Sequence, residues 1–171
     1  YWGLRYHMGD FWVTDLRTFR SRRIYRASRR TMSRGSEPVL APSQDRVCFR
    51  SGGIRCIDLR TGRERLIYGG RGTSGSWSHG GARPFSPSGQ RLVFRVDRER
   101  LMIHDFASGT TRVLIQPWRH WAYSFQDEHH VLSYDISHGG PALTRIHWPS
   151  GRVDHLIGPG SDFNQPAFVP G

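Results

Sequence analysis

The sequence contains no lysine, so all 25 of its basic residues are arginine. Because acidic residues number only 14, the formal net charge is +11. A surplus of this size favours a polyanionic partner, such as nucleic acid, acidic polysaccharide or an anionic lipid surface. A basic surface that binds nothing is the alternative interpretation.

Long apolar runs are also lacking. No stretch approaches the roughly 20 residues that span a bilayer, so we expect no membrane span. The chain begins at Tyr1 without a methionine, which favours a fragment or a processed chain.

Cysteine is scarce, with only Cys48 and Cys56 in the chain. Two cysteines make neither a metal-binding pattern nor a disulfide framework. They fall on neighbouring predicted strands, where one register places them on opposite faces, and we expect free, buried thiols. Cysteine therefore does not fix the compartment; an extracytoplasmic location (periplasm or cell envelope) is favoured but not established.

Catalytic motifs are missing as well: there is no nucleophile elbow, phosphate loop, HExxH or carboxylate pair at helical spacing. The adjacent His129 and His130 do not replace them, because neighbouring strand residues point to opposite faces of a sheet. We predict no catalytic residues and favour a protein that is not an enzyme.

What the sequence does contain is an internal repeat. Apolar segments that end in a polar turn recur, with Asp15, Asp58 and Asp105 in one register and His147 in the fourth copy. The segments are short, alternating, and separated by turn residues, which is typical of strands. Four strands in about 40–45 residues match the period of a propeller blade. The sequence therefore predicts an all-β fold, a β-propeller or propeller segment of about four four-stranded antiparallel blades.

The four blades form a single predicted domain, residues 1–171. Blade 1 covers residues 1–34 and is closed by a strand from residues 163–171, and blades 2, 3 and 4 cover residues 35–72, 80–118 and 119–160. The closure follows from joining the two chain ends, which then align without a gap onto Arg83–Phe94. Three assemblies stay open: a closed four-blade ring, a homodimer that completes a larger ring, and a fragment of a larger ring.

Two motifs resemble the TolB-type, WD-like propeller repeat, which also builds oligogalacturonate lyases and prolyl-oligopeptidase propellers. They are Phe85-Ser86-Pro87-Ser88-Gly89 with Leu92-Val93-Phe94, and Ile57-Asp58-Leu59-Arg60-Thr61-Gly62. The resemblance covers nearly the whole chain and implies the fold but no activity, because these residues are turns and core. The recurring aspartate is accordingly expected to be a strand-end turn residue. Blade 4 departs from the pattern at Gln126-Asp127-Glu128-His129. This indicates either that its sequence has drifted from the repeat or that the blade has been recruited for a function.

The loops that join successive blades carry the candidate binding residues, since in a propeller they gather on one face. The predicted ligand-binding residues are Arg29, Arg30, Arg34, Arg71, Trp77, Trp118, Arg119 and Trp121. Arginine binds carboxylates, phosphates or sulfates bidentately, and tryptophan stacks on flat rings. We expect a non-catalytic scaffold for an acidic ligand or protein partner, with local packing of the loops as the alternative.

Two other functions stay open. Resemblance to oligogalacturonate lyases implies an acidic polysaccharide substrate and a histidine-bound manganese or other divalent metal. His79, His120 and His138 are the tentative ligands, although the lyases' closely spaced histidine motif is absent; without this chemistry we expect no cofactor. A nucleic-acid-binding protein is the third interpretation, which the charge supports but no recognition motif does.

Overall fold

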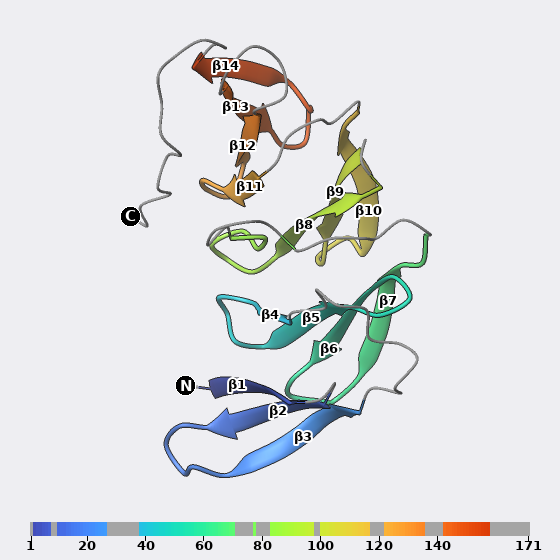
Figure 1. Ribbon diagram of the computed structural model, residues 1–171, viewed down its shortest axis with the longest axis vertical. Helices are drawn as coiled ribbons and strands as arrows, with labels where there is room; N and C mark the ends of the chain where they lie inside the picture. The colour runs from blue at the N-terminus through green and yellow to red at the C-terminus, as the bar shows by residue number, and fades with distance from the viewer. Residues whose placement is uncertain are drawn as a thin grey trace. The chain divides into compact units, whose positions relative to one another are not determined.

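The computed structural model describes residues 2–7, 10–26, 38–70, 77, 83–97, 100–116, 122–135 and 142–157. Residues 2–7, 11 and 135 are described by their backbone alone. The regular elements of this part of the chain are all β-strands (Figure 1), which confirms the all-β prediction. None of the described residues forms a helix long and apolar enough to cross a membrane.

The chain divides into two compact units, Tyr1–Thr73 and Ser74–Gly171. The first unit holds two antiparallel sheets, with strand orders β1-β2-β3 and β4-β5-β6-β7. The strands are β1 (Trp2–His7), β2 (Asp10–Asp15), β3 (Ser21–Arg26), β4 (Val39–Leu40), β5 (Arg46–Arg50), β6 (Ile54–Asp58) and β7 (Glu64–Tyr68).

The second unit holds the sheets β10-β9-β8 and β11-β12-β13-β14. Its strands are β8 (Arg91–Val96), β9 (Arg100–Asp105), β10 (Thr110–Ile115), β11 (Ala122–Phe125), β12 (His130–Asp135), β13 (Ala142–His147) and β14 (Val153–Ile157). A single bridge between Phe85 and Leu92 stands where the innermost strand of blade 3 was predicted. Four successive antiparallel sheets confirm the predicted fold, and we call them blades 1 to 4.

Each unit buries apolar side chains between its two blades. In the first unit, Val13 of blade 1 packs with Val47 and Leu59 of blade 2. In the second unit, Ile103 of blade 3 and Phe125 of blade 4 belong to one cluster of buried residues. Alternating strand residues therefore supply blade-to-blade cores, as expected for stacked sheets.

The two cysteines correct the sequence-based expectation. Cys48 on β5 lies directly opposite Cys56 on β6, and the two form a disulfide. The prediction of free thiols was therefore wrong. The register between β5 and β6 follows from the hairpin loop that joins them, residues 51–53, in which Gly53 has a φ of 140°. This three-residue loop places both cysteines on the same face of the sheet.

The strand pairing of blade 1 differs by one residue from the alignment of the joined chain ends with blade 3. β1 pairs with β2 so that Trp2 lies opposite Asp15, which is the position that Arg91 holds opposite Asp105 in blade 3. The gap-free alignment instead makes Trp2 equivalent to Gln90, one residue before Arg91. The predicted closing strand from the C-terminus lies outside the described residues.

A backbone hydrogen bond joins two turns at the same end of blades 2, 3 and 4. In each case an N–H of the turn after the third strand donates to a carbonyl of the turn after the first. The pairs are Leu59 N with Asp45 O (2.7 Å), Phe106 N with Gln90 O (2.9 Å) and Trp148 N with His129 O (2.7 Å).

Candidate functional site

Most of the predicted binding residues lie outside the described part of the chain. This holds for Arg29, Arg30, Arg34, Arg71, Trp118, Arg119 and Trp121, and for the tentative metal ligands His79, His120 and His138. Trp77 is described, and its side chain is buried, with 4% of its surface exposed. A buried ring cannot stack on a ligand from solvent, so the position of Trp77 supports a packing role.

The recurring aspartates are turn residues, as predicted. The Asp15 carboxylate accepts the Arg17 N–H at 2.9 Å, and the Asp58 carboxylate accepts the Thr61 N–H at 2.7 Å. These backbone donors hold the pKa of both carboxyls below its ordinary value of 3.8. Each of these two carboxylates therefore accepts hydrogen bonds within its own turn.

Charge is distributed very unevenly between the two units. Tyr1–Thr73 contains 16 arginines and 6 acidic residues, a surplus of ten, whereas Ser74–Gly171 contains 9 arginines and 8 acidic residues, a surplus of one. Almost the whole net positive charge of the protein thus belongs to the first unit, which contains blades 1 and 2. The total net charge of +11 does not by itself indicate this asymmetry.

The five acidic residues of the first unit that the structure describes, all but Glu37, are engaged by internal contacts. Ion pairs join Asp10 to Arg23 at 3.3 Å, Asp45 to Arg46 at 2.7 Å and Glu64 to Arg55 at 2.5 Å. Further arginines on the outer strands and turns of blades 1 and 2 are exposed, namely Arg17, Arg20, Arg22, Arg26, Arg60, Arg63 and Arg65. An exposed guanidinium group can bind a carboxylate or phosphate with two hydrogen bonds.

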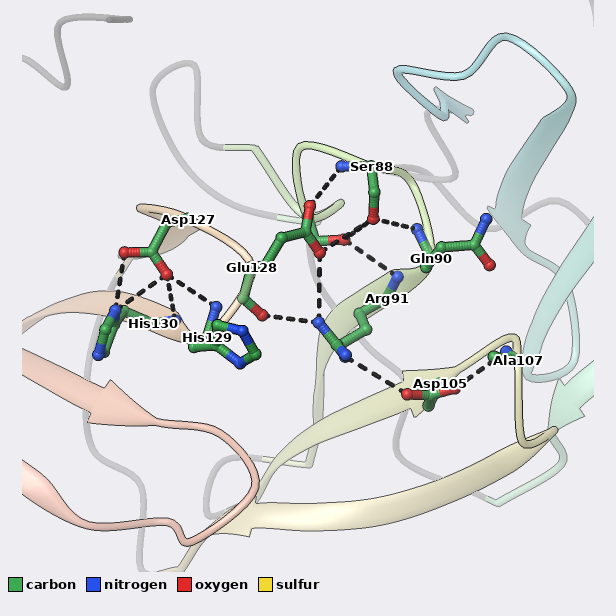
Figure 2. Close-up of polar contacts among 10 residues, drawn as sticks. Ser88, Gln90, Arg91, Asp105, Ala107, Asp127, Glu128, His129 and His130 are labelled. Carbon is green, nitrogen blue, oxygen red and sulfur yellow. Dashed lines mark hydrogen bonds and ion pairs between the residues drawn. The ribbon is translucent and has the colours of Figure 1, made fainter.

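In the second unit, the irregular turn of blade 4 serves as a joint to blade 3 (Figure 2). The Glu128 carboxylate accepts the Ser88 backbone N–H at 2.5 Å and the Ser88 hydroxyl at 2.9 Å. Arg91 donates to the Glu128 carboxylate at 3.2 Å and to its carbonyl at 2.8 Å. Arg91 also contacts Asp105 at 3.3 Å, so the departure of blade 4 from the repeat pattern builds a contact between blades.

The joint is arranged to hold Glu128 in its charged form. Partial burial raises the pKa of Glu128, but the hydrogen bonds from Ser88 and Ser86 and the charge of Arg91 outweigh it, so the pKa lies below its ordinary value of 4.5. Arg91 thus pairs with two carboxylates, those of Glu128 and Asp105. The second unit offers less free charge to a ligand than the first.

Blade 4 also places His130 opposite His147, with ring centroids 4.6 Å apart. Each ring has its own carboxylate: His130 Nδ1 lies 2.7 Å from Asp127, and His147 Nε2 lies 2.5 Å from Asp154. These are side-chain pairs within one sheet. Within the described ranges, no group of three or more His, Cys, Asp or Glu is placed to hold a metal ion.

The blades, their turns and their register define a β-propeller segment whose fold is similar to that of TolB proteins. Solved structures bear this out. TolB from Acinetobacter baumannii superposes with a TM-score of 0.55 at 19% identity, over 86% of this chain and 37% of that chain. An oligogalacturonate lyase in complex with manganese gives 0.60 at 15% identity, over 85% of this chain and 45% of that one.

A third similar structure is dipeptidyl peptidase 4 from Porphyromonas gingivalis, with a TM-score of 0.64 at 10% identity, over 91% of this chain and 30% of that one. At these identities the likeness shows the fold alone. The chain spans less than two thirds of each of the three proteins. No protein-family model matches it, and no curated protein matches it in sequence.

Proposed function

We propose that the protein is a non-catalytic propeller scaffold that binds an acidic ligand or an acidic protein partner through the loops and outer surface of its first two blades. The observation that carries the proposal is the charge asymmetry. Ten of the eleven surplus positive charges belong to Tyr1–Thr73, where internal ion pairs already occupy three of the acidic residues.

Arginine is suited to this role because its guanidinium group binds carboxylates, phosphates and sulfates with two parallel hydrogen bonds. The loop arginines Arg29, Arg30, Arg34 and Arg71 all belong to the charged unit. A rigid scaffold that carries variable loops is a common way to present binding residues. The disulfide of blade 2 supports an oxidising compartment as the place of binding.

The test is a titration of the full chain with polygalacturonate as the acidic probe, followed by calorimetry at low and high salt. We expect binding that weakens steeply with salt, because exposed charges are screened. The triple variant Arg29→Gln, Arg30→Gln, Arg34→Gln should lose about 100-fold or more in affinity, since each of the three lost charge-assisted contacts contributes about 1 kcal/mol or more.

A matched control removes the same charge from the other unit. Arg83, Arg112 and Arg152 are exposed residues of the second unit, and changing all three to glutamine should leave the affinity within about threefold, because salt screens an exposed charge that does not contact the ligand. Equal losses in the two triple variants would show that total charge alone attracts the probe, and would refute a site in the first unit.

A further inference from the structure

The turn between β2 and β3 contains a residue that the fold does not favour. Phe19 has a φ of 54°, in the left-handed region. The same turn position in the other blades is held by Gly62, Gly109 and Gly151, with φ of 72°, 69° and 71°. A residue with a Cβ pays roughly 1–2 kcal/mol for this conformation, which glycine adopts freely.

Packing does not compensate for the unfavourable backbone of Phe19. Its side chain is 79% exposed, more than any other large hydrophobic residue among those described. A Cβ added at Gly62 or at Gly109 would meet nothing within 4 Å, whereas one at Gly151 would meet the Leu114 carbonyl oxygen at 2.9 Å. This turn position therefore lies in open space in blades 2 and 3 but not in blade 4. A strained, exposed aromatic residue that contributes nothing to folding points to a role outside the fold.

The surroundings of Phe19 are basic. The hairpin Asp10–Arg26 contains five arginines and two aspartates, a surplus of three charges. Its arginines are Arg17, Arg20, Arg22, Arg23 and Arg26. One aspartate pairs with an arginine of the hairpin, and the other accepts backbone N–H groups of the turn. Leu16, which is 48% exposed, adds a second apolar side chain to the same turn.

The hairpin is also held in place by blade 2. Tyr25 of β3 packs against Phe49 with ring centroids 4.5 Å apart, and the Arg22 guanidinium donates to the Leu59 carbonyl. The turn therefore projects from an anchored strand, at the end of the β2–β3 hairpin (Figure 1). Little ordering is needed before it meets a partner.

We propose that this turn docks the protein on an anionic lipid surface. Phe19 and Leu16 enter the boundary between headgroups and acyl chains, and the arginines on either side contact lipid phosphates. Apolar side chains with cationic neighbours are the combination that holds proteins at such interfaces. The proposal shares Arg17 and Arg20 with the charged surface described above, but it rests on Phe19 and Leu16, which the proposed function does not use.

Other anionic partners fit this turn less well. A stable protein interface needs about 800 Å² per partner, which a five-residue turn cannot supply, whereas a lipid surface sets no such minimum. Single-stranded nucleic acid binds by stacking its bases on aromatic rings along a basic groove. Leu16 cannot stack, and the exposed ring here stands at a projecting turn.

The experiment is co-sedimentation of the full chain with vesicles of phosphatidylcholine, with or without a one-third share of phosphatidylglycerol. We expect binding to the anionic vesicles only. Each arginine near an anionic surface strengthens binding about fivefold, so Arg17→Gln with Arg20→Gln should weaken it about 25-fold. Phe19→Gly should weaken it about tenfold or more, because the apolar surface that enters the membrane is lost.

Phe19→Gly separates binding from folding, because the same change should raise the melting temperature. Leu66→Ser is the matched control: it removes an apolar side chain of the same unit that is 51% exposed, and should leave vesicle binding unchanged. Equal binding by the wild type and Phe19→Gly would overturn the proposal. So would a preference for an oligonucleotide over the anionic vesicles in direct competition.

Discussion

Replacing Glu128 with alanine is expected to loosen the contact between blades 3 and 4. The change removes the carboxylate that accepts the Ser88 N–H at 2.5 Å and the Ser88 hydroxyl at 2.9 Å. Arg91 would keep its hydrogen bond to the backbone carbonyl of residue 128, so part of the joint should survive. The loss is therefore that of the carboxylate contacts alone.

The magnitude follows from these contacts. Hydrogen bonds to a charged acceptor contribute at least about 1.5 kcal/mol each. Solvent reaches the Glu128 side chain, which is 34% exposed, and we reduce the sum to about 2 kcal/mol for this reason. In urea unfolding followed by tryptophan fluorescence, this corresponds to a midpoint lower by about 1 M.

The pH dependence gives the sharper test. Because the folded-state pKa of Glu128 lies below its ordinary value of 4.5, its contribution to stability is complete above the unfolded pKa and disappears as the pH falls through the folded pKa. The wild type and the Glu128→Ala variant should therefore differ at pH 7 and converge in acid. A difference that persists unchanged below pH 3 would show that the carboxylate charge is not the cause.

A surface ion pair inside one blade serves as the control. Glu64 pairs with Arg55 at 2.5 Å on neighbouring strands of blade 2, with both side chains about one third exposed. Glu64→Gln should cost less than about 1 kcal/mol, as is usual for exposed pairs. Equal losses at Glu64 and Glu128 would contradict the idea that the contact between blades is the more important one.

Three further changes test the fold. Phe19→Gly should raise the free energy of unfolding by about 1 kcal/mol, measured by thermal melting, because the left-handed backbone is relieved. Changing Cys48 and Cys56 together to serine should lower it by about 2.5 kcal/mol, since a short loop is no longer closed in the unfolded chain; the unreduced wild type should show no thiol to Ellman's reagent. Gly53→Ala should cost at least about 2 kcal/mol in urea unfolding, because its Cβ would meet the Tyr68 carbonyl oxygen at a φ that alanine avoids.

Local features of the sequence predicted the blades well. The alternating segments and the turns around Asp58 and Asp105 are independent of distant contacts, and the structure confirms both. The pairing of Cys48 with Cys56 depends instead on how many residues the hairpin loop holds. A one-residue change in that loop moves a strand's side chains to the other face, and the residue types alone do not fix the count.

The candidate site was harder to predict. The importance of Phe19 could have been found by aligning the four turns, since it stands where the other copies have glycine. Its exposure and conformation needed coordinates. The contact of Glu128 with Ser88 joins residues of different blades, and no periodicity in the sequence indicates such a partner.

The turn-to-turn hydrogen bonds of blades 2, 3 and 4 have a consequence for how such a chain can change over generations. They join main-chain atoms, so every substitution of the donor residue except proline leaves the N–H and the carbonyl in place. Each copied unit can thereby keep these bonds at one end while its side chains there change, provided that the donor residue is not proline. Insertions and substitutions in the loops at the opposite end of the blades leave these hydrogen bonds intact. Duplicated blades can therefore diverge in the ligands that they bind while their fold stays the same.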